Sequence, residues 1–326
     1  MRDNLMTFSK LLGTGSYLPE TILTNFDMEK LVDTSNDWIV ERTGIRQRHK
    51  AEAHETAVYM AEKAAEQAMK EAGITPKDIG MIVIATTTPE KMFPSTACLL
   101  QQRLGIAGCP AFDLNSAACA GFMYGLSIAD QYIRTGTIKN ALVIGSEMMS
   151  RVVDWNDRTT CVLFGDGAGA VVLGASNEPG ILSTHLHADG THKDVLFLPV
   201  SVGRPMDVEA ALYVQMKGNQ LFKLAVNILG DLFDETLAAN NLNKSDIDWL
   251  VPHQANIRII EAMAKKLELP MERVAITLHE QGNTSSASIP LALDKAIREN
   301  KIKRGDMLML EGFGGGLAWG SALIKY

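Results

Sequence analysis

The sequence predicts an α/β protein made of two similar halves, and two kinds of observation support this. Short apolar runs typical of buried strands alternate along the chain with amphipathic helical segments. Residues 78–83 (DIGMIV) resemble residues 246–251 (DIDWLV), 168 positions later, and residues 133–139 share two dipeptides with residues 297–303, 164 positions later. The shared order and nearly equal spacing of these matches indicate an internal duplication.

Helices and strands alternate in the first half. An alanine-rich helix is expected over residues 56–72, because its alanines share one side of a helix and Gly73 can end it. A second helix is expected to begin near Ser95 and to end at Gly105. The remaining predicted elements are strands over residues 81–85, 111–114, 141–144 and 171–173 and a helix over residues 120–134.

The second half repeats this order of elements. Strands are expected over residues 249–251 and 307–310, and a helix is expected to start around Ser286. The segment GASNEPG at residues 174–180 is rich in turn residues. We therefore expect the two halves to be residues 1–176 and 177–326.

Composition excludes several classes of protein. The chain has 326 residues, of which 46% are hydrophobic and 21% charged, values typical of a globular protein and not of a disordered one. A formal net charge of −7 argues against a surface built to bind nucleic acid. No apolar run reaches the roughly 18–20 residues of a membrane span, and the first residues lack the apolar core of a secretory signal. Four cysteines without a Cys-x-x-Cys pair predict reduced thiols in a cytoplasmic protein.

Cys119 is the candidate nucleophile. It lies in NSAACAGF (residues 115–122), where a small-residue turn separates a predicted strand from a predicted helix. At the start of a helix, unpaired backbone amides and the helix dipole would favour the thiolate. The alternative is an inert buried thiol, and for Cys98, Cys109 and Cys161 that alternative is preferred.

Two further polar residues follow buried elements of the second half. His253 ends a predicted strand, at the edge where α/β folds place their ligands, and it lies 168 positions after Ala85. Asn283, 164 positions after Cys119, precedes a predicted helix. A structural histidine and a helix-capping or turn asparagine are the alternatives. Because the duplication relates Asn283 to Cys119, we expect a site between the two halves.

Glycines at residues 312 and 314–316 let backbone amides approach a ligand closely, as an oxyanion hole requires, although a tight connection between strands would use them too.

Two other segments resemble binding motifs but do not complete them. The segment GDGAGA (residues 165–170) lacks the third glycine of a dinucleotide-binding motif and runs into a strand. His185, His187 and Asp189 alternate along a strand, but no compact ligand spacing completes them, so we predict no metal site.

Four motifs in this order, AACAGF (residues 117–122), VPHQAN (251–256), GNTS (282–285) and GFGGG (312–316), give the chain a close resemblance to the β-ketoacyl-(acyl carrier protein) synthase III family. These are the initiating condensing enzymes of bacterial type II fatty acid synthesis. The resemblance extends from DWIVERTGI (residues 37–45) to WGS (319–321). It implies a thiolase-like duplicated fold of five αβαβα layers, a homodimer, and no cofactor, with acetyl-CoA as a substrate.

The resemblance also implies a Cys-His-Asn triad of Cys119, His253 and Asn283, with the amides of Cys119 and Gly315 as oxyanion hole. The reaction would be decarboxylative Claisen condensation of acetyl-CoA with malonyl-(acyl carrier protein) through an acetyl-cysteine. An asparagine at position 283 is typical of the initiating enzymes, since the elongating enzymes carry a second histidine there.

Substrate-binding residues follow from the same resemblance. Those implied for coenzyme A are Thr34, Trp38, Arg42, Arg158 and Asn256, with Trp38 and Arg158 holding the adenine between them. Those implied for the acyl pocket are Phe313 and Phe93, the latter reaching across the dimer. A basic patch for the acidic carrier protein is expected from Lys223, Arg258, Lys265 and Lys266. Gln281 and Thr159 depart from the residues common in the family at those positions.

Two alternatives remain open. A related thiolase-fold synthase with the same triad could use another acyl primer, of branched-chain, polyketide or quinolone type. A non-catalytic carrier-binding paralogue is the second alternative, and the intact triad argues against it.

Overall fold

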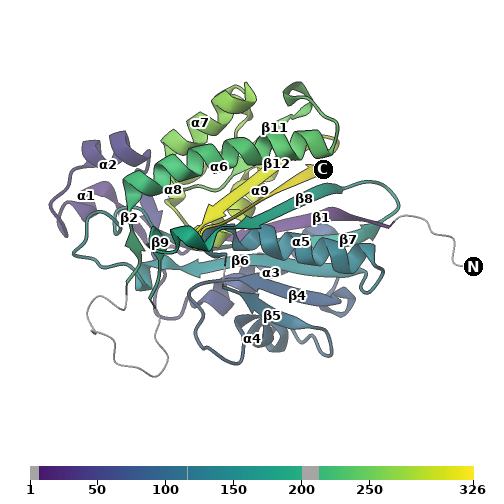
Figure 1. The fold of residues 1–326 in the computed structure, drawn as a ribbon. Helices are drawn as coiled ribbons and strands as arrows, with labels where there is room; N and C mark the ends of the chain where they lie inside the picture. Colours follow the sequence, from purple (N-terminus) through teal and green to yellow (C-terminus); the bar gives the residue numbers. More distant parts are fainter. Residues whose placement is uncertain (1–6, 116, 200–212) are drawn as a thin grey trace, which may run out of the picture.

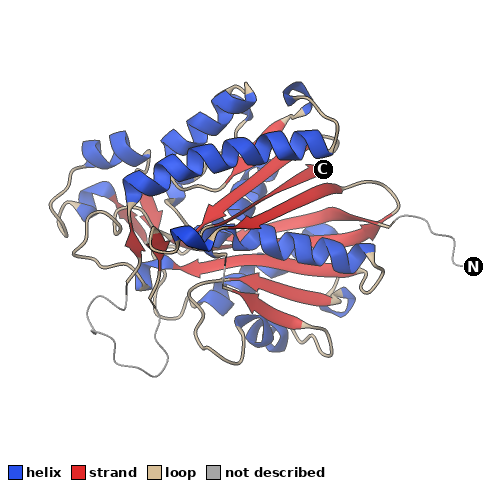
Figure 2. Cartoon of the chain, in the orientation of Figure 1, coloured by secondary structure: helices blue, strands red, loops and turns tan. Residues whose placement is uncertain are grey.

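Two stacked β-sheets with helices between and outside them form the protein, whose computed structural model describes residues 7–115, 117–199 and 213–326. Figure 1 shows the elements in the order of the chain, and Figure 2 shows the alternation of helical and sheet layers.

The first sheet has the strand order β1-β7-β6-β4-β5. Its strands are β1 (Phe8–Tyr17), β4 (Met81–Ala85), β5 (Ala111–Leu114), β6 (Asn140–Met148) and β7 (Asp166–Ser176). β4 lies parallel to both β5 and β6, whereas β7 is antiparallel to β1 and β6. Every residue of β4 is buried, as expected of a central strand covered by helices on both faces.

The second sheet repeats that order as β8-β13-β12-β11. Its strands are β8 (Ile181–Ala188), β11 (Trp249–Pro252), β12 (Met307–Gly314) and β13 (Ala318–Lys325). A parallel bridge between Leu250 and Val274 occupies the place that β5 has in the first sheet. The two halves therefore share one topology.

The longer helices form three layers around the two sheets. They are α3 (Ala57–Ala72), α4 (Thr96–Arg103), α5 (Gly121–Arg134), α6 (Gly218–Ala239), α7 (Ile257–Leu267) and α9 (Ser288–Arg298). α3 and α4 cover the outer face of the first sheet, α6 covers that of the second with α7 beside it, and α5 and α9 lie between the sheets. This arrangement confirms the predicted five-layered duplicated fold.

Local details repeat as well. Thr75 and Asp78 form a capping box before β4, and Asn243 and Asp246, each 168 positions later, form one before β11. In the central layer, Arg134 pairs with Asp130 at 2.9 Å, and Arg298 pairs with Asp294 at 2.8 Å, 164 positions later. The repeat spacings found in the sequence therefore correspond to equivalent places in space.

The smaller elements gather on the left of Figure 1, beside the ends of both sheets. They are α1 (Asn25–Met28), α2 (Asn36–Thr43), α8 (Leu278–Gln281) and the strand pairs β2 (Ile22–Thr24) with β3 (Gln47–His49) and β9 (Leu196–Phe197) with β10 (Gln215–Met216). Short 3₁₀ helices connect elements at η1 (Pro76–Asp78), η2 (Ala118–Ala120), η3 (Met149–Arg151), η4 (Gly190–His192), η5 (Lys244–Asp246), η6 (Met271–Arg273) and η7 (Ser285–Ala287).

The predicted element boundaries are confirmed in part. Thr56 caps α3 at its start and Gly73 ends it in a left-handed conformation, while Ser95 caps α4. The helices predicted from residues 120 and 286 begin at Gly121 and Ser288, each after a 3₁₀ turn. β12 was expected to end at residue 310 and instead continues to Gly314, because its pairing with β13 extends through the glycines.

β7 ends at Ser176 and β8 begins at Ile181, and the division of the chain at residues 176 and 177 stays a prediction.

Among the helices of the described ranges, none combines the length and the apolar character needed to cross a membrane.

Candidate active site

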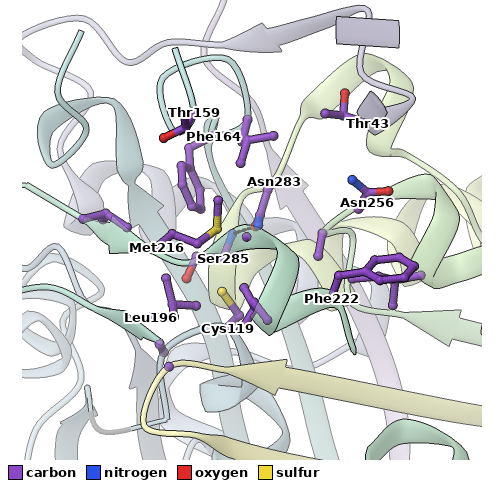
Figure 3. A pocket seen from close by; sticks show the side chains of 18 of the residues that line it. Thr43, Cys119, Thr159, Phe164, Leu196, Met216, Phe222, Asn256, Asn283 and Ser285 are labelled. Carbon is purple, nitrogen blue, oxygen red and sulfur yellow. Dashed lines mark hydrogen bonds between the residues drawn. The ribbon is translucent and has the colours of Figure 1, made fainter. Parts of the chain in front are cut away.

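A cavity of about 590 Å³ opens between the two halves, and Cys119, His253 and Asn283 all line it. Cys119 comes from the first half and the other two residues from the second. Figure 3 shows Cys119, Asn283 and Ser285 facing the same space. The structure thus brings together the three residues that the sequence singled out.

Cys119 lies in the short helix η2, directly before α5, with only 5% of its surface exposed. Ala118, just before it, has a φ of 42°, and Ser285, across the cavity, has a φ of 50°. Residues other than glycine rarely adopt this left-handed conformation, and such residues concentrate at functional sites.

The surroundings of Cys119 change the pKa of its thiol in both directions. Burial and, to a smaller extent, the nearby Glu147 raise the pKa of the Cys119 thiol to about 12, although Ser285 acts to lower it. The position ahead of a helix is as predicted, and the residue lies almost buried in the wall of the cavity.

His253 follows the last residue of β11, where its backbone N–H donates to the Glu311 carbonyl at 2.8 Å. Its Nδ1 lies 2.6 Å from the Ser288 hydroxyl, which also accepts from the backbone N–H of Gln254 at 3.3 Å. A Ser288 hydroxyl that donates to Nδ1 leaves the ring hydrogen on Nε2. Burial lowers the pKa of His253 to about 3, so the ring is neutral.

Asn283 is held through its backbone and its side chain. Its N–H donates to the Leu163 carbonyl at 2.9 Å, and its carbonyl accepts from Gly165 at 3.0 Å. The backbone N–H of Ser285 donates to Asn283 Oδ1 at 2.8 Å. With its oxygen engaged in this way, the side chain has its NH₂ group free to donate to a ligand.

The glycine-rich segment approaches Cys119 closely. A Cβ on Gly314 would lie 2.7 Å from the Cys119 backbone nitrogen and 2.6 Å from the Ala117 carbonyl, so only glycine fits there. Gly315 and Phe313 line the cavity. The segment is both a strand end and a cavity wall.

Trp38 and Arg42 line another part of the cavity, and Arg158 packs against Trp38. The Arg158 guanidinium lies 5.3 Å from the Trp38 ring centre, and that of Arg42 lies 5.9 Å from it. Arg158 is fixed by donating to the Asp33 carbonyl at 2.7 Å. An aromatic ring with two guanidinium groups close to it suits a flat heteroaromatic ligand.

Of three other residues predicted to bind substrate, one lines the cavity and also makes structural contacts, and two lie outside the cavity lining. Asn256 lines the cavity, but it also caps α7 and donates to the Arg42 carbonyl at 2.9 Å. Thr34 does not line the cavity, and its buried hydroxyl has no partner among the described residues. Phe93 is 83% exposed and does not line this cavity either.

The four residues of the predicted basic patch are all exposed, but one of them is paired with an acidic side chain. Arg258 lines the cavity and Lys265 is exposed on the same helix, α7. Lys223 is exposed on α6, next to the cavity residue Phe222. Lys266 instead pairs with Asp234 of α6 at 2.8 Å.

Three polar residues beside the site, Glu147, Ser285 and Ser288, were not among the residues predicted from the sequence. Glu147 is fully buried at the end of β6 and accepts hydrogen bonds from Ser285 and from the threonines that follow β4. A single acid in the otherwise uncharged run ALVIGSEMM (residues 141–149) was a signal that could have drawn attention to it.

His185 and His187 are neighbours on one face of β8, and both contact Glu235 of α6, at 3.2 and 2.8 Å. Within the described ranges, no group of three or more histidine, cysteine or acidic side chains could hold a metal ion.

Comparisons with known proteins identify the family of the chain. Residues 112–190 match the family 3-oxoacyl-(acyl-carrier-protein) synthase III, and residues 237–326 match its C-terminal part. A beta-ketoacyl-(acyl-carrier-protein) synthase III of Alkalilimnicola ehrlichii is 59% identical over 324 residues, which is 98% of this chain and 100% of that protein.

Solved structures show the same likeness. The crystal structure of a 3-oxoacyl-(acyl-carrier-protein) synthase III from Aquifex aeolicus superimposes with a TM-score of 0.92 at 48% identity, covering 98% of this chain and 100% of that one. The priming β-ketosynthase of a polyketide biosynthetic pathway superimposes with a TM-score of 0.92 at 37% identity, covering 97% and 96%. The resemblance found in the sequence is confirmed, and the chain belongs to the 3-oxoacyl-(acyl-carrier-protein) synthase III family of condensing enzymes.

Proposed function

We propose that the protein condenses acetyl-CoA with malonyl-(acyl carrier protein) to acetoacetyl-(acyl carrier protein), releasing carbon dioxide and coenzyme A. The observation that carries this proposal is the convergence of a thiol, a neutral imidazole and a carboxamide on one cavity between the halves. Membership of the family supplies the reaction class.

In the first step, the Cys119 sulfur attacks the thioester carbonyl of acetyl-CoA and forms an acetyl-cysteine. The amides of Cys119 and Gly315 are proposed to bind the tetrahedral oxyanion. The closeness of Gly314 to the Cys119 amide supports this placement, because a side chain there would displace the donor.

In the second step, malonyl-carrier loses carbon dioxide and leaves an enolate. We assign His253 Nε2–H and the Asn283 NH₂ group as the donors that stabilise its oxygen, and Phe313 as an apolar wall beside the departing carboxylate. The enolate carbon then attacks the acetyl-cysteine and expels the Cys119 thiolate. A neutral histidine supports this assignment, since it offers a hydrogen without a competing charge.

Trp38 and Arg158 are proposed to hold the adenine of coenzyme A, with Arg42 and Asn256 near it and Thr34 as a weaker candidate. Arg158→Ala should raise the KM for acetyl-CoA about tenfold, because a desolvated cation–π contact is worth about 1–2 kcal/mol. Steady-state kinetics with acetyl-CoA varied at saturating malonyl-carrier would measure this.

Lys50→Ala is the matched control, because Lys50 stacks 5.3 Å above Trp155 and neither residue lines the cavity. Equal KM values for Arg158→Ala and the unaltered protein would remove Arg158 from the coenzyme A site.

Arg258, Lys265 and Lys223 are proposed to attract the acidic carrier protein, whereas Lys266 contributes less because Asp234 neutralises it. Lys265→Glu should raise the KM for malonyl-carrier about fivefold at low salt, or roughly 1 kcal/mol. Added salt should remove most of the difference.

Lys303→Glu makes the same charge change at an exposed position outside the cavity. Equal effects of the two reversals would mean that the net charge of the protein, and not this surface, governs carrier binding.

Acetyl is the proposed primer, and turnover of acetyl-, isobutyryl- and octanoyl-CoA with malonyl-carrier tests it against other condensing enzymes of this fold. Preference for isobutyryl- or octanoyl-CoA would assign the chain to another primer class. No condensation with any of them, and no adduct on Cys119, would favour a non-catalytic carrier-binding protein.

We further propose a homodimer in the cytoplasm. The exposed Phe93 supports a dimer in which this side chain enters the partner's acyl pocket. The free thiols of all four cysteines support the location.

A further inference from the structure

Ser288 is the first residue of α9, and its side chain does not serve its own helix. A serine at the start of a helix commonly accepts hydrogen bonds from the backbone of that helix. The Ser288 hydroxyl instead contacts His253 and Gln254, which lie 35 and 34 positions earlier in the chain. The residue is fully buried, with 0% of its surface exposed. Its hydroxyl therefore belongs to the surroundings of His253.

The contacts of Ser288 determine where each hydrogen atom can go. The backbone N–H of Gln254 can only donate, so Ser288 Oγ, 3.3 Å away, is its acceptor. The single hydrogen of the Ser288 hydroxyl then has one acceptor among the described residues, His253 Nδ1 at 2.6 Å. A hydrogen on Nδ1 would leave this buried hydroxyl hydrogen without an acceptor, which is costly. The arrangement that pairs every hydrogen therefore has Ser288 donating to Nδ1 and the ring hydrogen on Nε2.

The buried side chain of Gln254 holds the backbone on both sides of the ring. Its NH₂ group donates to two backbone carbonyls and its oxygen accepts from two backbone N–H groups, at 2.7–3.1 Å, and the partners are Pro252, Ala275, Thr277 and Leu278. All four hydrogen-bonding positions of the amide are thus occupied. The backbone of residue 253 is fixed without help from Ser288, whose contact is with the ring itself.

The other ring nitrogen opens onto the cavity. His253 lines the cavity, and its Nε2 has no hydrogen-bond partner among the described residues. Nε2 is also absent from the unpartnered side-chain atoms that the described protein shields from solvent, so it is open to the cavity. In the proposed second step this nitrogen donates a hydrogen to the enolate oxygen. A ring with its only hydrogen on Nδ1 would turn a lone pair toward that oxygen and would repel it.

We propose that Ser288 is a positioning residue that keeps the hydrogen of the His253 ring on Nε2, where the enolate formed from malonyl-carrier needs a donor. The hydrogen bond made by one ring nitrogen commonly decides which nitrogen carries the hydrogen. This inference rests on the proposed function. Ser288 does not line the cavity, and it acts only through His253. Its hydroxyl keeps its own hydrogen throughout the reaction.

Nitrogen-15 NMR of the protein labelled in its histidine rings tests the position of the hydrogen directly. A ring nitrogen without a hydrogen resonates well downfield of one that carries a hydrogen. The spectrum of His253→Gln identifies the two His253 signals by their loss. At neutral pH the unaltered protein should carry a hydrogen on Nε2 and none on Nδ1. A hydrogen on Nδ1, alone or together with one on Nε2, would overturn the proposal.

Ser288→Ala removes the hydroxyl and should change both the spectrum and the chemistry. The two His253 signals should move toward each other as the second tautomer becomes populated. Carbon dioxide release from malonyl-carrier should slow about tenfold, the scale of one hydrogen bond, with an unchanged KM for malonyl-carrier. Unchanged signals, or an unchanged rate of decarboxylation, would show that Ser288 does not set the donor.

Two further variants separate the hydrogen bond from packing. Ser288→Thr keeps the hydroxyl and should recover most of the rate. Ser288→Cys keeps the size of the side chain but offers only a weak donor, so it should be nearly as slow as Ser288→Ala. Full activity of Ser288→Cys would mean that Ser288 only fills space, and the positioning role would be wrong. Because threonine adds a methyl group at a fully buried site, the cysteine variant keeps the test decisive if Ser288→Thr does not fold.

Ser146→Ala is the matched control. Ser146 is equally buried, and its hydroxyl also makes one hydrogen bond, to the Ala57 carbonyl of α3 at 2.8 Å, but it does not line the cavity. This variant should leave the His253 signals and the rate of decarboxylation unchanged. Equal slowing by Ser146→Ala and Ser288→Ala would trace the effect to a general loss of stability and would contradict the proposal.

Intact-mass measurement of the acetyl adduct on the same samples separates this proposal from the proposed function. Acetylation uses the Cys119 sulfur and backbone amides, so Ser288→Ala should acetylate normally. No adduct on the unaltered protein would overturn the proposed function itself. A normal adduct with undiminished decarboxylation in Ser288→Ala would overturn the role of Ser288 alone, as would equal losses of the two steps.

Discussion

Cys119→Ala is expected to abolish acetyl-enzyme formation and to lower condensing activity by at least about 10⁴-fold, the scale seen when a covalent nucleophile is removed. The reason is chemical, because no other thiol lies in the cavity and neither His253 nor Asn283 can carry the acyl group through the second step. Incubation with labelled acetyl-CoA followed by peptide mapping would measure the adduct.

Cys98→Ala is the control for this experiment, because Cys98 is a free thiol outside the cavity. That variant should acetylate normally. Acetyl label on any residue of Cys119→Ala would show that another group is the nucleophile. Since alanine removes one buried sulfur, unchanged thermal unfolding would confirm that the loss is chemical.

The parts of the fold that could be predicted are those fixed by local sequence. β4 and β5 match their predicted bounds, because short apolar runs between turn residues leave little choice of register. Helix ends were predictable where the residue itself fixes the end. Thr56 and Ser95 cap helix starts with their side chains, and Gly73 ends a helix in the left-handed conformation. The duplication was visible because the repeated residues pack or cap in the same way in both halves.

The parts that could not be predicted depend on contacts between distant elements. The pKa of Cys119 is raised first by burial, and it also responds to Ser285 from the other half and to Glu147 on β6, none of which its own segment reveals. Lys266 has the spacing of an exposed surface lysine, yet Asp234, on α6, pairs with it. β12 extends into glycines because β13 supplies its hydrogen-bonding partner there.

Asn283→Ala is expected to leave acetylation nearly intact and to slow decarboxylation of malonyl-carrier by about 10²- to 10³-fold, the usual value of one donor to a developing oxyanion. Acetylation uses the sulfur and backbone amides, whereas the enolate needs the Asn283 NH₂ group. Rapid-quench acetylation and release of labelled carbon dioxide would measure the two steps separately.

Asn283→Asp gives the sharper form of this prediction. Aspartate keeps the oxygen that accepts from the Ser285 backbone N–H, so Ser285 should stay in place beside Cys119. It replaces the NH₂ donor with a second oxygen, and a carboxylate there would repel the enolate. Decarboxylation should therefore fall at least as far as in Asn283→Ala. If Asn283→Asp decarboxylated malonyl-carrier normally, the amide would not be the donor, and loss in the alanine variant would reflect displacement of Ser285.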